Sequence, residues 1–146
     1  MSQATRPIVG REILQKRVGK TMALYVPEWD GEIILRQFSH TQVVYVQSLA
    51  TGAVDMDKQS IRDTSALTRF NFAMIRNAWV DEAGNPVLSD DDFDDTMAQP
   101  NSVIKLIVST VAEFNDMNEN AKAAAKVHSD TKKNLAVTTN GASGTN

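Results

Sequence analysis

The chain has no cysteine, two histidines and only four prolines among its 146 residues. Without cysteine it can form neither a disulfide framework nor a thiolate metal site. Of the two histidines, His40 and His128, the second lies in a polar segment that is expected to be disordered, so a metal site built on both is not expected. The seven glycines are scattered and form no glycine-rich phosphate loop. These absences predict a protein that is not an enzyme, with no catalytic residues, no metal and no cofactor.

Long apolar runs are also missing. No stretch approaches the roughly 20 apolar residues that cross a bilayer, and the first ten residues lack the apolar core of a signal peptide. The 15 basic and 18 acidic residues leave a formal net charge of −3, which argues against a broad basic face for nucleic acid. We therefore expect a soluble intracellular protein with neither membrane nor nucleic acid as a partner.

The N-terminal part of the chain predicts a β-hairpin. Residues 1–7 are polar and are expected to form a loose arm, followed by one short helix over 8–17. Two stretches with strand-forming residues, 21–26 and 32–38, flank a turn that contains Pro27 and an Asp-Gly pair. Because two strands are marginal alone, the hairpin at 20–38 needs helices to pack against.

Helical patterns dominate the rest of the chain. Residues 42–50 fit a strand by propensity and a helix by spacing. Residues 57–79 predict a long helix with apolar stripes on two sides. Residues 103–114 form the most apolar helical pattern, which predicts the central core element, with a cap at Asn101 or Ser102. Residues 119–127 are rich in alanine and predict a frayed extension. The polar segment from His128 to the end predicts a disordered tail.

The densest local signals lie between Arg76 and Gln99. Gly84 and Pro86 predict a tight reversal after the long helix. Ser89 predicts the N-cap of a short helix whose first turn is acidic, where carboxylates suit the positive helix end. The acidic residues are Asp90, Asp91, Asp92, Asp94 and Asp95. They are consecutive and lack the alternating ligands of a calcium loop, so we interpret them as a solvated, helix-capping face. Their like charges repel one another, so the helix is expected to be weak until a basic partner binds.

Two segments carry a family resemblance. Val80 to Asp92 reads VDEAGNPVLSDDD and is followed by the apolar helix at 103–115, and Val26 to Ile33 reads VPEWDGEI. This order resembles that of the tail assembly chaperones of long-tailed bacteriophages over roughly residues 20–120. The resemblance implies a capped amphipathic helix at 42–50. It carries no catalytic residue.

The fold expected from these signals is α+β and helix-rich. A single chaperone-like domain covers 1–127, with the hairpin at 20–38 followed by a small helical bundle whose main helical region is 57–127, and the tail at 128–146 is disordered. The resemblance implies a chaperone that binds the tape-measure protein and helps to recruit tail-tube subunits in the host cell cytoplasm. It also implies absence from the finished virion. A small tail or head-completion protein retained in the virion is the alternative, and a homo-oligomer remains an alternative to a monomer.

Four apolar side chains are the candidate partner contacts. Trp29 lies in the hairpin turn, where an exposed tryptophan suits an interaction hot spot. Phe72, Ile75 and Trp79 form the second stripe of the long helix, which is either buried or shared with a partner. Burial in the protein's own core is the alternative for all four and is the favoured one for Trp29 and Trp79.

Overall fold

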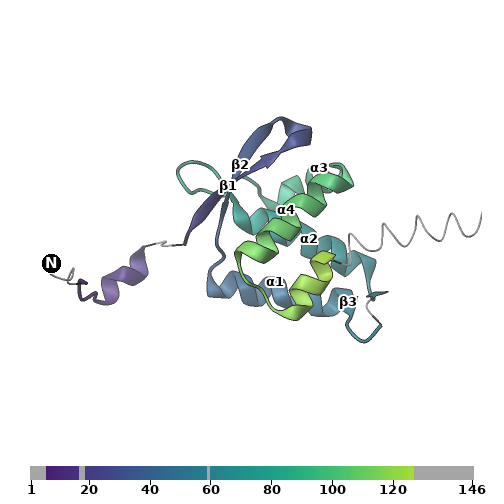
Figure 1. Ribbon diagram of the computed structural model, residues 1–146, viewed down its shortest axis with the longest axis horizontal. Coiled ribbons are helices and arrows are strands. Elements are labelled where there is room, and N and C mark those ends of the chain that lie inside the picture. The colour runs from purple at the N-terminus through teal and green to yellow at the C-terminus, as the bar shows by residue number, and fades with distance from the viewer. Residues whose placement is uncertain (1–5, 17–18, 59, 127–146) are drawn as a thin grey trace, which may run out of the picture.

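The computed structural model describes residues 6–16, 19–58 and 60–126. A small antiparallel sheet stands at one end of a helical body, and Figure 1 shows the β1–β2 hairpin at the top and α1 at the bottom. This arrangement confirms the predicted helix-rich α+β fold with an N-terminal hairpin. The strands are β1 (Thr21–Val26), β2 (Gly31–Arg36), β3 (Val54–Asp55), β4 (Ser60–Ile61) and β5 (Trp79–Val80). The α-helices are α1 (His40–Ala53), α2 (Thr64–Ala78), α3 (Phe93–Met97) and α4 (Asn101–Phe114), and the 3-10 helices are η1 (Arg11–Gln15), η2 (Pro27–Trp29) and η3 (Asp90–Asp92).

The predicted hairpin is present, and a third strand extends it. β1 and β2 pair along their full lengths, and β5 adds to the other edge of β2, so that Trp79 lies opposite Leu35. The turn between β1 and β2 is η2, which ends at Asp30 in the left-handed region with a φ of 47°. Aspartate is one of the few residues with a side chain that adopt this conformation readily, and the Asp30 carboxylate also accepts a hydrogen bond from the Tyr25 hydroxyl at 3.0 Å.

Residues 40–53 form a helix, as the family resemblance implied, and not a strand. Ser39 begins it with a capping box: its hydroxyl accepts from the backbone N–H of Gln42 at 3.1 Å, and the Gln42 side chain accepts from the N–H of Ser39 at 2.9 Å. The inner face of α1 buries Val46, Ala50 and Ala53 against α2. Satisfied end groups and burial therefore outweigh the strand propensity of the valines.

The long helix predicted from Asp57 begins only at Thr64, so that boundary is wrong. Asp55 explains the difference, because its carboxylate accepts from the backbone N–H groups of Asp57 and Lys58 and closes a turn. The short strands β3 and β4 pair on either side of this turn. Asp63 then caps α2 by accepting from two backbone N–H groups at 2.9 and 3.2 Å.

The core lies where α2 packs against α1 and α4. Phe70, Met74 and Ile107 have no exposed surface, and fully burying one such side chain contributes about 1.5–3 kcal/mol. The predicted role of residues 103–114 as a core element is confirmed. The buried residues of α4 are Val103, Ile104, Ile107, Val108, Val111 and Ala112.

The start of α4 differs from the prediction of a cap at Asn101 or Ser102. Asn101 is already helical, and the N-cap is Pro100, which makes no side-chain capping bond. The hydroxyl of Ser102 instead donates to the carboxylate of Glu28 in the hairpin turn. This contact ties the beginning of α4 to the sheet.

The alanine-rich segment is a packed element and not a frayed one. Residues 119–126 are helical, and small side chains let this helix approach the core closely. Its buried residues are Ala121, Ala124 and Ala125. Val127 and the tail predicted at 128–146 lie outside the described residues.

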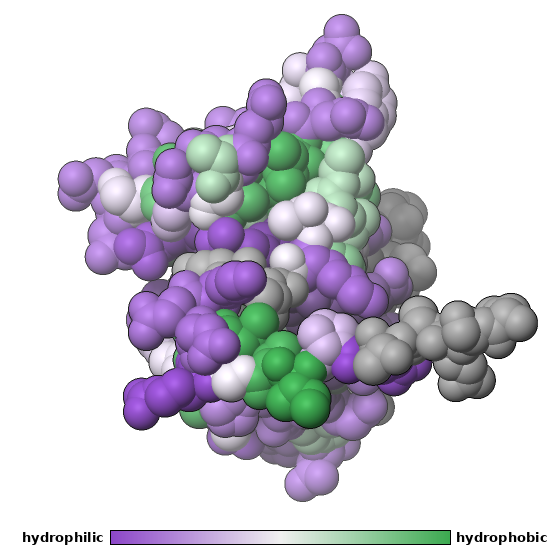
Figure 2. Space-filling view, turned by 90° about the vertical axis from the view of Figure 1, so that its left-hand side faces the viewer, coloured by the Kyte–Doolittle hydropathy of each residue, from purple (hydrophilic) through white to green (hydrophobic). Residues whose placement is uncertain are grey.

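The helix predicted over 8–17 is present only as η1. None of its residues is buried, and Figure 1 shows this segment projecting from the body. Ile8, Val9 and Leu14 are exposed. The N-terminal side of the molecule faces the viewer in Figure 2, where apolar patches are separated by hydrophilic residues.

Candidate docking surface

The predicted reversal between Arg76 and Gln99 is present. Asp81 organises it, because its carboxylate accepts from the N–H groups of Ala83 and Asn85, both at 2.9 Å. Gly84 adopts a φ of 87°, as its position in the turn predicted. The chain returns antiparallel to β5, with the N–H of Val87 donating to the carbonyl of Trp79 at 3.2 Å. The residues after the turn therefore lie beside Trp79.

The acidic helix begins at the predicted cap. The backbone N–H of Ser89 donates to the carboxylate of Asp92 at 2.8 Å, and the Ser89 hydroxyl accepts from the N–H of Asp91 at 3.3 Å. η3 and α3 follow this cap. Asp90 also pairs with Arg76 at 3.2 Å, which ties the acidic turn to α2. This segment is thus held at both its cap and its first turn.

One side of the acidic segment borders a small groove that contains both tryptophans. Trp29 and Trp79 stack with ring centroids 5.5 Å apart and planes 25° apart. The indole N–H of Trp29 donates to Oε1 of Gln99 at 2.9 Å. We call the space of about 180 Å³ beside them the tryptophan groove, lined chiefly by Trp29, Trp79, Leu88, Asp92 and Asp95. Both indoles are partly buried, so each serves the fold and still contributes surface.

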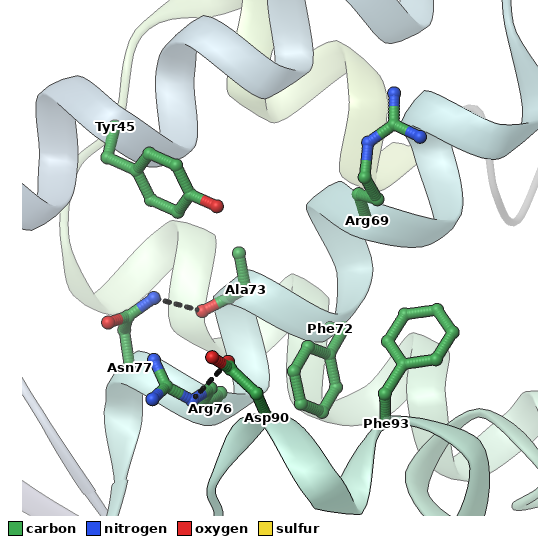
Figure 3. A pocket seen from close by; sticks show the side chains of 8 residues that line it. All are labelled: Tyr45, Arg69, Phe72, Ala73, Arg76, Asn77, Asp90 and Phe93. Atoms are coloured by element: carbon green, nitrogen blue, oxygen red, sulfur yellow. Dashed lines mark hydrogen bonds and ion pairs between the residues drawn. The ribbon is translucent and has the colours of Figure 1, made fainter.

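The other side of the acidic segment borders a wider groove. Phe72 and Phe93 meet edge to face, with ring centroids 5.0 Å apart and planes at 71°. Figure 3 shows their rings side by side on one flank, with Tyr45 of α1 across from α2. We call this space of about 370 Å³ the aromatic groove, lined chiefly by Tyr45, Arg69, Phe72, Arg76, Asp90 and Phe93.

Three of the four sequence-predicted contact residues line these grooves, and one does not. Trp29 and Trp79 come together in the tryptophan groove, and Phe72, which is buried with only 8% of its surface exposed, presents that remaining edge to the aromatic groove. Ile75 has no exposed surface and belongs to the core, because it points from α2 toward the packed interior. Ile75 therefore offers nothing to a partner in this conformation.

Comparison with known proteins agrees with the resemblance. The sequence model of the phage tail assembly chaperone family matches residues 13–133. The chain belongs to the phage tail assembly chaperone family. Among solved structures, the tail assembly chaperone of bacteriophage HK97 is similar over 71% of this chain and 94% of that one, with 16% sequence identity and a TM-score of 0.49. No curated protein sequence matches this chain.

The described residues line the two grooves with aromatic and charged side chains. Within the ranges described, no three histidine, aspartate or glutamate side chains converge as metal ligands. In the same part of the chain, no helix is long and apolar enough to cross a bilayer. The hydroxyl of Ser102 donates to Glu28 and lowers the pKa of that exposed carboxyl below its ordinary value. What the two grooves offer is aromatic surface edged by charge.

Sequence reasoning missed Tyr45 and Phe93 as groove residues. Tyr45 is 54% exposed, and the sequence signal for it was an aromatic residue within the helical pattern at 42–50. Phe93 follows the acidic turn, and its contact with Phe72 depends on the reversal that returns the chain to α2. A local pattern does not reveal such a contact between segments.

Proposed function

We propose that this protein is a non-catalytic chaperone of tail morphogenesis that binds the tape-measure protein and helps to recruit tail-tube subunits. The proposal places it in the host cell cytoplasm during assembly and outside the mature virion. Membership of the tail assembly chaperone family supports a role in assembly. The single observation that carries a binding role is the stacked pair Trp29–Trp79 beside an open groove.

In this proposal the protein acts by shifting the equilibrium between free and bound partner. A partner that occupies the grooves has its own apolar surface covered, so less of it is available for aggregation. Tryptophans in partly enclosed pockets are enriched among the residues that dominate interface energies, and truncating one typically weakens binding by more than about 2 kcal/mol, or roughly 30-fold. On this basis Trp29, Trp79 and Phe72 are the proposed contacts.

Co-expression with the tape-measure protein of the same phage tests the proposal. We expect the chain to raise the soluble fraction of the tape-measure protein and to be retained with it in a pull-down. Trp29→Ala should weaken this retention by roughly 30-fold. Met56→Ala is the control, since Met56 is a 41% exposed large apolar residue that lines neither groove.

Two results would contradict the proposal. One is a tape-measure protein that is equally soluble and unbound when the chain is absent. The other is a stoichiometric amount of the chain in purified virions, measured by mass spectrometry, which would assign it a structural role. Thermal unfolding of Trp29→Ala must accompany the pull-down, because Trp29 also bonds Gln99 and stacks on Trp79.

A further inference from the structure

The aromatic groove has a cationic wall. Arg69, Phe72 and Arg76 follow one another on α2 at spacings of three and four residues, so they share one face of the helix. The two arginines are two turns apart, about 10.5 Å along the axis. In Figure 3 Arg69 lies above the rings of Phe72 and Phe93, and Arg76 lies to the left of Phe72. A partner lying along α2 therefore meets a guanidinium, then aromatic surface, then a second guanidinium.

Both guanidiniums can donate hydrogen bonds to a carboxylate of a partner. Nη1 of Arg69 donates to the hydroxyl of Ser65 at 2.8 Å. Because this hydroxyl is neutral, the bond does not neutralise the positive charge of the guanidinium. Arg76 pairs with Asp90, but the side chain of Asp90 is 87% exposed. An ion pair this exposed contributes little to stability, so a partner carboxylate can replace Asp90 at small cost. Planar guanidiniums also suit bidentate binding of carboxylates.

The surface around the groove extends its apolar character. Tyr45 on α1 is 54% exposed and lines the groove together with Phe72 and Phe93, and its sequence neighbour Val44 is 52% exposed. The groove thus lies between two packed helices, α1 and α2, with η3 and α3 on its far side. A channel of this kind between helices accepts the apolar face of a further helix.

We propose that the aromatic groove binds an amphipathic helix of a tail protein whose apolar stripe is flanked by carboxylates. The apolar stripe covers Tyr45, Phe72 and Phe93, and the carboxylates reach Arg69 and Arg76, displacing Asp90. This inference rests on the proposed function for the existence of a tail-protein partner. It adds the chemistry of the segment that the partner presents and assigns it to a groove other than the tryptophan groove.

Two labelled helical peptides of about 20 residues test the chemistry of the groove. They share one leucine stripe, and its flanks carry glutamate in one peptide and lysine in the other. Fluorescence anisotropy with the full chain should show the glutamate peptide binding at least about tenfold tighter at low salt. This preference should shrink in about 0.5 M salt, since screening weakens exposed charge pairs.

Variants separate the groove from general charge effects. Arg69→Glu should weaken binding of the glutamate peptide about tenfold or more, whereas Arg69→Lys, which keeps the charge but loses the bidentate geometry, should weaken it less. Arg62→Glu makes the same charge change at an exposed residue outside the groove and should alter the affinity less than about threefold. Tyr45→Ala should weaken both peptides, because it removes apolar contact and no charge.

Three outcomes would overturn the inference. The lysine peptide could bind as tightly as the glutamate peptide, or Arg69→Glu and Arg62→Glu could have equal effects. The chain could also form a dimer in sedimentation that Tyr45→Ala abolishes, which would assign the groove to a second copy. None of these results bears on the co-expression test with the tape-measure protein, so the proposed function and this inference fail separately.

Discussion

Replacing Gly84 by alanine tests the turn that places the acidic segment between the two grooves. Gly84 has a φ of 87°, and an added Cβ would lie 3.0 Å from Nη1 of Arg36. A residue with a side chain costs about 1–2 kcal/mol in this left-handed region. The guanidinium can move away from the new methyl group, so the backbone term dominates. We expect Gly84→Ala to lower the free energy of unfolding by about 1–2 kcal/mol.

Gly52→Ala is the matched control with the opposite expected sign. Gly52 lies within α1, and an added Cβ would meet no heavy atom within 4 Å. Alanine restricts the unfolded chain and favours the helix, so this variant should gain about 0.5–1 kcal/mol. The chemical change is one methyl group in both variants. The expected change in stability has opposite signs because Gly84 has a positive φ and Gly52 is helical.

Urea unfolding followed by far-ultraviolet circular dichroism measures both variants. With a slope of about 2 kcal/mol per molar urea, Gly84→Ala should lower the midpoint by about 0.5–1 M and Gly52→Ala should raise it by about 0.25–0.5 M. Equal slopes are required for this comparison, since a changed slope indicates a changed denatured state. Midpoint shifts of the same sign for both variants would refute the reasoning.

Three further predictions concern stability and ionisation. Asp63→Ala should lower the free energy of unfolding by about 1 kcal/mol because two backbone donors at the start of α2 lose their acceptor, and an unchanged urea midpoint would contradict this. Ile107→Ala should lower the free energy of unfolding by about 2–5 kcal/mol, measured by thermal unfolding, since Ile107 has no exposed surface. A loss below about 1 kcal/mol would contradict its place in the core. Ser102→Ala should raise the pKa of Glu28 toward the ordinary value of 4.5, as measured by NMR titration of its carboxyl group. Because the folded pKa of Glu28 is depressed, its contribution to stability is present above pH 4.5 and is lost as the pH falls through the folded pKa, a dependence that Ser102→Ala should reduce.

The acidic segment borders both grooves. Asp90 borders the aromatic groove, while Asp92 and Asp95 border the tryptophan groove. A ligand that displaces Asp90 from Arg76 removes one attachment of this segment, while its cap at Ser89 and the contact between Phe93 and Phe72 remain. The two grooves are therefore connected through one short element of the chain.

Several features of the fold were predictable because their signals are local. The turn at Gly84 and the cap at Ser89 each satisfy backbone groups within a few residues of the signal, whereas the capped helix after Ser39 was implied only by the family resemblance. The start of α2 was predicted too early because another local signal was overlooked. Asp55 forms a competing local turn, and the pairing of β3 with β4 then ends any helix before Asp63.

The sequence by itself determined the hairpin, the reversal, the acidic cap and the apolar character of α4, since each depends on neighbouring residues and on helical or strand spacing. Only the tertiary structure decided how deeply each apolar side chain is buried. Phe72 and Ile75 are equally apolar and three residues apart on α2, yet packing against α1 and α4 leaves Ile75 with no exposed surface, whereas Phe72 keeps 8% of its surface at the wall of the aromatic groove. Likewise, Trp29 and Trp79 stack only because β5 joins the sheet, a long-range pairing that no local pattern specifies.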